Sequence, residues 1–158
     1  MTVNVHVQTE DFSLDAAYNA IRARDGAAIG AIAAFVGLVR DLNKKAGDGS
    51  AVARLTLEHY PGMTETSIEK IAEQASTRWK TLSIDIYHRV GDLAPTDQIV
   101  MVLVSSGHRE DAFAAAEFVM DYLKTEAVFW KKETSENGTR WIESTSGDRE
   151  RALGWRRS

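Results

Sequence analysis

One stretch of the chain, SSGHREDAFAAAEFVMDYLKTEAVFWKK at residues 105–132, gathers four cationic side chains around a single predicted helix. His108 and Arg109 stand where an apolar strand pattern gives way to a helical one. Lys124 lies near the end of that helix, and Lys131 follows seven residues later. The first turn of a helix exposes unpaired backbone N–H groups that can bind a phosphate, and lysines add positive charge. These residue types and spacings predict a site that holds an anion.

Each of these side chains also has a simpler structural explanation. His108 would cap the helix, and Arg109 would lie in solvent. Lys124 follows Met120 by four residues and therefore borders the predicted buried stripe of the helix. A solvated lysine near the negative end of a helix is nevertheless the simpler interpretation. The predicted stripe consists of Phe113, Ala116, Met120 and Leu123.

Strand geometry limits what the lysines after the helix can do. Lys131 and Lys132 are neighbours in a predicted strand, so their side chains point to opposite faces and at most one of them faces the site. Phe129 shares the face of Lys131, and Trp130 shares the other face. The two aromatic residues are most simply part of the core.

The composition predicts one globular domain over residues 1–158. The chain has a formal net charge of -4 and 44% apolar residues, which excludes fibrous and disordered classes. Its mild acidity disfavours nucleic acid, because binding to a phosphate backbone usually requires a basic face. The N-terminal segment lacks signal-peptide regions, and the longest uncharged run, residues 26–39, is shorter than the ~20 residues that span a bilayer. We therefore expect a cytoplasmic protein without a membrane partner.

The chain contains no cysteine and only four histidines. Disulfides, thiolate nucleophiles and cysteine zinc sites are therefore excluded, and any sulfur that reacts here must be delivered by another molecule. The histidines have no HExxH or similar ligand spacing. We predict no bound metal and no cofactor.

The elements that must position these residues can be read from periodicity and turn residues. Segment 27–40 is ambiguous, because its apolar residues keep helical spacing while Gly30 and Gly37 weaken a helix. Segment 41–50 is polar and is expected to be an exposed loop, either a lid or an idle connection. Strands are expected at 3–7, 52–60, 82–90, 99–104, 128–134 and around 141–142. Helices are expected at 14–24, after the break at Pro61 and Gly62 with a core stripe that reaches Trp79, and at 109–125. We expect a hairpin to join the strands at 82–90 and 99–104.

Five strings occur in order along the chain: FVGLVRD at 35–41, LEHYPGM at 57–63, HRVGDL at 88–93, SGHR at 106–109 and MDYLKTEAVFWKKE at 120–133. Together they closely resemble the catalytic large subunit of molybdopterin synthase, from residue 30 to residue 143. Several ordered motifs with matching gaps are far more specific than any single one. The chain is therefore identified as a member of this family.

The resemblance implies sulfur transfer. Members of the family convert cyclic pyranopterin monophosphate into molybdopterin by installing the two dithiolene sulfurs. The sulfur comes from the thiocarboxylated C-terminal Gly-Gly of a small ubiquitin-like subunit, which fits a chain without cysteine. Members are homodimers with one small subunit at each end, which gives a heterotetramer. The implied fold is α+β, an α/β hammerhead with a largely antiparallel sheet and about three helices, and it favours a strand at 31–40.

The resemblance also implies roles for individual residues. Lys124 of MDYLK matches the principal catalytic lysine, and Lys131 of FWKK matches the second essential lysine. His108 and Arg109 of SGHR match residues that hold the phosphate region of the pterin, and Arg40 of FVGLVR matches another cation of the same pocket. Two apolar residues would contribute to the wall: Phe35 and Met120. Taken together, the two ends of the helix are expected to belong to one pocket.

The chain departs from the family at three places. Val128 stands where members commonly have proline, which loosens a turn without changing a charge. Ser144 and Thr145 stand where many members carry an arginine that reaches the neighbouring protomer, so Arg140 and Arg149 are the alternatives for that role. The tail at 146–158 matches poorly, and both disorder and contact with the partner are open.

Two other classes of function remain as alternatives. A non-catalytic scaffold of the same fold would bind phosphate and partner without chemistry, and the intact Lys124 and Lys131 argue against it. A phosphate-ester hydrolase that uses His108 would need a carboxylate or metal partner, and no convincing constellation is present.

Overall fold

Two four-stranded sheets and the helices around them make up the described part of the chain. The computed structural model describes residues 1–40, 52–127, 129–135, 138–142 and 146–156. Sheet A has the order β1 (Thr2–Gln8), β4 (Ser83–Arg89), β6 (Gln98–Ser106) and β2 (Ala31–Leu38). Sheet B has the order β5 (Gly91–Leu93), β3 (Val52–His59), β7 (Phe129–Ser135) and β8 (Gly138–Ile142). The helices are α1 (Leu14–Asp25), the short 3₁₀ turn η1 (Gly26–Ala28), α3 (Met63–Arg78), α4 (Arg109–Leu123) and α5 (Ser146–Arg156).

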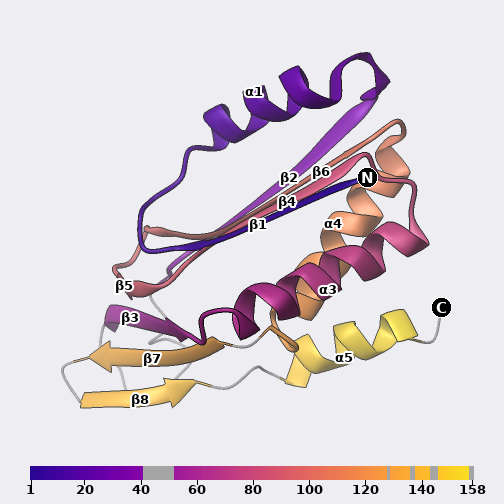
Figure 1. The fold of residues 1–158 in the computed structure, drawn as a ribbon. Coiled ribbons are helices and arrows are strands. Elements are labelled where there is room, and N and C mark those ends of the chain that lie inside the picture. Colours follow the sequence, from indigo (N-terminus) through magenta and orange to yellow (C-terminus); the bar gives the residue numbers. More distant parts are fainter. Residues whose placement is uncertain (41–51, 128, 136–137, 143–145, 157–158) are drawn as a thin grey trace.

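Sheet A lies between two helical layers, with α1 on one face and α3 and α4 on the other (Figure 1). β1 pairs with β4 in parallel, whereas β4 and β2 both pair with β6 in antiparallel register. β6 is buried from Val100 to Ser106, as a strand covered on both faces must be. The predicted α+β class, the largely antiparallel pairing and the hairpin between β4 and β6 are confirmed.

Segment 27–40 forms η1 and then β2, so the strand expected from the resemblance is confirmed. Its apolar residues Ile32 and Val36 have a spacing that fits a helix, but in β2 they lie on the same face and pack toward α1. Gly37 is required by close packing, because a Cβ there would lie 2.8 Å from Cγ1 of Val100. The glycine that weakens a helix therefore suits this strand.

The first helix begins as the sequence predicts. Ser13 is the N-cap of α1, and its hydroxyl accepts a hydrogen bond from the backbone N–H of Ala16 at 3.1 Å. The end of α1 is tied to sheet A by the paired cluster, which we define as Arg24, Asp25, Ser83, Asp85 and Ser105. Arg24 bonds to the carboxylates of Asp25 and Asp85, and Asp25 accepts hydrogen bonds from the hydroxyls of Ser83 and Ser105, which lie 2.6 Å apart. This network fixes α1 at the end of sheet A where β4 begins.

The predicted buried stripe of α4 is wrong at Phe113, whose side chain is 67% exposed. The buried face of the helix instead consists of Ala112, Ala115, Ala116, Phe118, Val119, Tyr122 and Leu123. This face is buried because Phe118 packs edge-on against Trp79 and Trp155, with ring centroids 5.4 and 5.7 Å away. Met120 is half-buried at the margin of that core.

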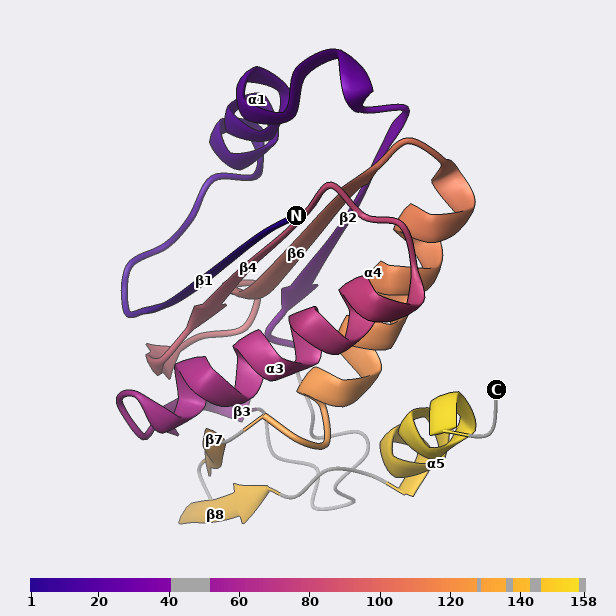
Figure 2. The ribbon, with the colours of Figure 1, turned by 45° about the vertical axis from the view of Figure 1, so that its right-hand side comes forward.

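Disorder of the tail is wrong for Ser146–Arg156, which forms α5, a fourth α-helix within the described residues. Trp155 anchors α5: its indole N–H donates to Oδ2 of Asp121 at 2.7 Å, and its carbonyl accepts from Arg78 at 2.8 Å. Ala152 is buried in the same core. Figure 2 shows α5 beside the C-terminal end of α4. The tail of the chain is therefore part of the fold around Lys124.

Three expectations lie outside what the structure describes. Segment 41–51, Val128 and residues 143–145 are outside the described residues, and so is the side chain of Arg140 in β8. Within the described ranges, no helix has both the length and the apolar character that crossing a bilayer requires.

Candidate functional site

The two ends of α4 are too far apart to line one pocket within a protomer. His108 is the N-cap and Lys124 the C-cap of a helix of 15 residues. At 1.5 Å per residue, such a helix is about 22 Å long. The expectation of a single pocket that joins His108 and Arg109 to the lysines is therefore wrong for one copy of the chain.

Three of the predicted cations lie at one end of sheet A. α4 follows β6 and runs back along it, so Lys124 returns to the end where β6 begins (Figure 1). Arg40 reaches the same end, because Leu38 pairs with Gln98 and the N–H of Val39 donates to the carbonyl of Asp97 at 2.8 Å. The Arg40 side chain is exposed.

Lys131 is brought to this end by sheet B. In β7 it lies opposite Leu57 of β3, a fully buried residue, and its own side chain is half-buried. Phe129, two residues earlier on the same face, stacks on the ring of His88 with centroids 4.0 Å apart. This aromatic contact joins β7, the strand that carries Lys131, to β4 of sheet A. The prediction that Phe129 is core and shares the face of Lys131 agrees with this packing.

The electrostatic environment of Lys131 disfavours its charge. Burial lowers the pKa of Lys131 to about 8, and the positive charge of Lys124 acts in the same direction. Asp148 of α5 partly opposes both effects. Among the described residues, neither lysine ammonium lies in an ion pair with a carboxylate. An amine with a pKa near 8 can release and take up a proton near neutral pH.

His88 is the second group whose charge is suppressed here. Burial lowers the pKa of His88 to about 3, although the hydrogen bond to the carbonyl of Arg89 favours the protonated form. The charges of Lys131, Lys124 and His59 also lower the pKa. We call Lys124, Lys131, His59 and His88 the lysine cluster.

The two apolar wall residues are placed differently. Phe35 is 41% exposed on β2, and its ring lies over Gly37, with Cε1 3.3 Å from where a Cβ of Gly37 would be. Met120 lies one helical turn before Lys124 and is half-buried. Met120 can therefore line the approach to Lys124, whereas Phe35 lies on β2, which is an edge strand of sheet A among the residues that the structure describes.

The opposite end of α4 carries His108 and Arg109, both exposed. His108 occupies the N-cap, but its side chain makes no capping hydrogen bond, so the simple capping explanation accounts only for its position. Its backbone N–H donates to Oγ of Ser106 at 3.2 Å. The loop is fixed by backbone contact, because a Cβ at Gly30 would overlap the carbonyl of Gly107. Both side chains are free to meet a ligand from outside the protomer.

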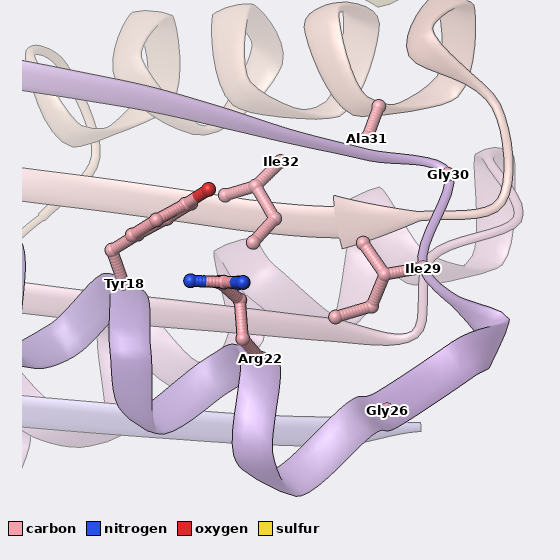
Figure 3. A pocket seen from close by; sticks show the side chains of 7 residues that line it. All are labelled: Tyr18, Arg22, Gly26, Ile29, Gly30, Ala31 and Ile32. Carbon is pink, nitrogen blue, oxygen red and sulfur yellow. The ribbon is translucent and has the colours of Figure 1, made fainter.

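A hollow of about 430 Å³ lies between α1 and the start of β2 (Figure 3). Tyr18 and Arg22 of α1 point into it, and Arg22 lies over the Tyr18 ring at 5.4 Å. It contains none of the predicted site residues. Since Ala31 pairs with Ser106, it lies at the His108 end of sheet A, on the face opposite α4.

Sequence reasoning missed the part that His88, His59 and Asp148 play around the lysines. The HRVGDL and LEHYPGM strings contain both histidines, but adjacency to Lys131 depends on how the two sheets pack and leaves no local signal. Arg149, one alternative for a cross-dimer arginine, is exposed on α5. Within the described part of the chain, no group of three or more His, Asp or Glu side chains is placed to hold a metal ion.

Comparison with known proteins gives consistent matches. The family described as MoaE protein matches residues 7–126. The chain is 52% identical over 149 residues to the molybdopterin synthase catalytic subunit of Ralstonia nicotianae, covering 94% of this chain and 81% of the relative. It is 49% identical to that of Vibrio cholerae, covering 98% and 99%. The solved structure of a molybdopterin biosynthesis MoaE protein from Burkholderia ambifaria superposes with a TM-score of 0.81 at 53% identity, covering 98% of each chain.

Proposed function

The chain belongs to the MoaE protein family, and from this membership we propose which of its residues carry out the reaction of a molybdopterin synthase catalytic subunit. The protein is a sulfurtransferase of molybdenum cofactor biosynthesis. It takes sulfur from the thiocarboxylated C-terminus of a small subunit and forms the dithiolene of molybdopterin on cyclic pyranopterin monophosphate. The hammerhead-type α+β fold expected from the resemblance is confirmed. A cytoplasmic location and a single domain over residues 1–158 stay predictions.

Lys124 and Lys131 are the catalytic residues in our proposal. The observation that carries it is the lysine cluster itself: two ammonium groups near each other, one half-buried, without a carboxylate partner among the described residues. Such an arrangement destabilises the free protein and is relieved when an anion binds. A thiocarboxylate supplies that anion. Lys124, at the open end of α4, would hold it, and Lys131 would move a proton as sulfur adds to the pterin.

Arg40, His108 and Arg109 would hold the phosphate of the pterin, but within one protomer His108 and Arg109 lie at the opposite end of α4 from Arg40 and the lysines. We propose that the site is completed across a homodimer. β2 is an edge of sheet A within the described residues, and its outer side exposes Phe35 and Leu38. Unpaired edges of this kind are ready to pair with another strand.

Antiparallel pairing of β2 with its copy would solve the separation of the two ends of α4. A two-fold axis near the middle of β2 places the Ala31 end of one strand beside the Leu38 end of the other. His108 of the second protomer, which lies beside Ala31, would then approach Arg40 and Lys124 of the first. The same contact would cover the exposed Phe113 of α4. Phe35 would become part of the interior wall.

The catalytic assignment is tested with Lys124→Ala and Lys131→Ala. Each variant is incubated with the thiocarboxylated small subunit and cyclic pyranopterin monophosphate, and the dithiolene product is measured. We expect each to lose at least about 100-fold in rate, as removal of a group that stabilises developing charge typically does. Lys70→Ala, on the exposed face of α3, is the matched control and should keep wild-type activity. Near-normal product from Lys124→Ala would reject the assignment, and small-subunit binding without product in the wild type would indicate a scaffold.

A mixed dimer tests the shared site. One protomer carries Lys124→Ala and the other carries Arg109→Ala, and we expect each variant homodimer alone to be inactive. If the sites are shared, one site of the mixed dimer keeps both residues, and about half of the wild-type rate returns. If each protomer contains its own site, both sites stay broken and the mixed dimer is inactive.

A further inference from the structure

His88 lies in the lysine cluster without a role in the reaction described so far. It is the sixth residue of β4, on the face that carries Ile84 and Ile86 into the core under α3 and α4. Only 6% of its surface is exposed. A polar ring in such a position must have a defined hydrogen bond and a defined neighbour.

One side of the His88 ring is fixed by a hydrogen bond. Nδ1 lies 2.9 Å from the backbone carbonyl of Arg89, and a carbonyl can only accept, so Nδ1 carries the proton and donates. In the neutral ring, Nε2 is then unprotonated. The carbonyl is itself held in place, because the Arg89 guanidinium donates to the carbonyl of Thr9 at 3.1 Å and that of Gln98 at 3.3 Å.

The face of the His88 ring is fixed by Phe129. The two rings are 4.0 Å apart and inclined by 22°, which is a stacked arrangement. Phe129 is the first residue of β7, opposite His59 of β3, and Lys131 follows on the same face. The stack therefore joins sheet A to the strand that carries Lys131.

We propose that His88 is a positioning residue for Lys131: its neutral ring, bonded to Arg89 and stacked on Phe129, holds the start of β7 so that the ammonium group stays in its half-buried place. The inference rests on the proposed catalytic role of Lys131. His88 does not touch the reacting atoms. A charged residue at this position would add a third cation to the cluster, whereas the neutral ring contributes packing alone.

The charged and titratable groups around the ring come from six elements. Lys131 lies on β7 and Lys124 at the end of α4, and both act on His88. Arg89 follows it on β4. The three remaining elements bring two pairs: His59 of β3 with Glu65 of α3 at 3.7 Å, and Asp148 with Arg151, both of α5, at 2.6 Å. Because of these pairs, the net positive charge beside the ring comes chiefly from the two lysines.

The proposal is tested by comparing His88→Ala with His88→Phe. Phe keeps a ring to stack on Phe129, and Ala removes it. Two quantities are measured in the full chain: kcat and KM with the small subunit and pterin, and the titration of Lys131 by NMR after ¹³C-methylation of the lysines, assigned with Lys131→Arg. For His88→Phe we expect kcat within about threefold of wild type and an unchanged titration.

For His88→Ala we expect kcat to fall at least about tenfold with little change in KM, because a misplaced catalytic group slows the bound state. Water would enter beside Lys131, so its pKa would rise from about 8 toward the ordinary lysine value of about 10.4. His6→Ala is the matched control: His6 also stacks on a ring, that of Tyr87 at 4.5 Å, but it is exposed on the other face of sheet A. It should leave both quantities unchanged.

Each result decides something. Wild-type kcat and titration in His88→Ala would overturn the proposal, and so would a His88→Phe variant that behaves like His88→Ala. If His88→Ala does not fold, His88→Leu, which stays apolar without a ring, takes its place in the same comparison. A raised pKa of Lys131 with an unchanged kcat would leave the positioning role intact and reject the catalytic role of Lys131.

Discussion

Two clusters of charged side chains, each partly buried, lie at opposite ends of sheet A, and they differ in whether a carboxylate balances the positive charge. In the paired cluster, Asp25 accepts hydrogen bonds from Ser83 at 2.6 Å and Ser105 at 2.7 Å, and Arg24 bonds to Asp85 at 2.9 Å. In the lysine cluster, Lys131 and Lys124 face each other's charge without a carboxylate partner among the described residues. The charges of the first cluster are balanced within the protein, whereas in our proposal those of the second are balanced by a bound anion.

The pKa values express this difference. Burial opposes the charge of Asp25, but the hydrogen bonds from Arg24, Ser83 and Ser105 outweigh it and lower its pKa to about 2. Burial also opposes the charge of Lys131, and its neighbour Lys124 adds to the opposition, so its pKa falls to about 8. The surroundings favour the charged form in one cluster and disfavour it in the other. The first cluster stabilises its charges within the fold, and the second is the one to which we assign the chemistry in our proposal.

The largest effect is expected from breaking the paired cluster with Asp25→Ala. The change removes the acceptor of two buried hydroxyls, which can then bond only to each other, and one partner of the partly exposed Arg24; together these losses are expected to cost about 3 kcal/mol. Urea unfolding should show this loss in the free energy of unfolding. Glu69→Ala, an exposed acid on α3, is the control and should change it by less than about 0.5 kcal/mol. If Asp25→Ala loses less than about 1 kcal/mol in the free energy of unfolding, the paired cluster does not stabilise the fold as we expect.

A smaller effect is expected from acid, and it acts through His88. The folded-state pKa is about 3 and the unfolded value about 6.5, so the unfolded chain takes up the proton first as pH falls. His88 therefore costs the folded state stability below pH ~6.5, by about 2–3 kcal/mol between pH 6.5 and 4.5. His88→Phe should lose this part of the acid sensitivity. Parallel stability curves for the two proteins over that range would refute the expectation.

The third effect has the opposite sign to the first. Lys131→Met keeps the length of the side chain and removes an unpaired charge, so we expect the folded state to gain about 1–2 kcal/mol at pH 7 while sulfur transfer is lost. The wild-type lysine is deprotonated more easily when folded than when unfolded, so its penalty fades as pH rises from about 8 to about 10.4. The advantage of the variant should shrink over the same range in urea titrations. If Lys131→Met is less stable than the wild type, the charge of Lys131 is stabilised by its surroundings in the folded protein, as the charges of the paired cluster are.

The smallest effect is the coupling between the two lysines. Lys124→Ala removes a positive charge, so the pKa of Lys131 should rise, by less than about one pH unit because the contact is partly open to water. NMR titration of Lys131 measures it, with Lys70→Ala as control. A fall or no change would mean that the two charges do not share a site.

Local sequence patterns predicted much of the fold because its strands and caps depend on neighbours in the chain. Ser13 at the start of α1 and the apolar run of β6 are of this kind. Phe113 shows where the approach fails. α4 has two candidate apolar faces with the same helical spacing, and Trp79 and Trp155, from elements distant in sequence, decide between them.

The candidate site was predicted in part for the same reason. Lys124 and Lys131 stand in motifs, so the resemblance identifies them one by one. The distance between His108 and Lys124 follows from the length of the helix that joins them, so it could have been predicted from the sequence. Motif matching identifies residues one by one and says nothing about the distance between them. His88 could not be placed beside Lys131 from the sequence, because that contact forms only when β7 of one sheet packs on β4 of the other.

The parallel pairing of β1 with β4 has a consequence for synthesis on the ribosome. Thr2 cannot pair in sheet A until Ser83 has been synthesised, because these two residues are partners in the sheet. At translation rates of about 5–20 residues per second, the first strand is made about 4–16 s before its neighbour. During that interval Val3, Val5 and Val7 have no sheet to join and are available to chaperones. Lys124 and Lys131 are translated later still, so all four strands of sheet A can be made before these two lysines exist.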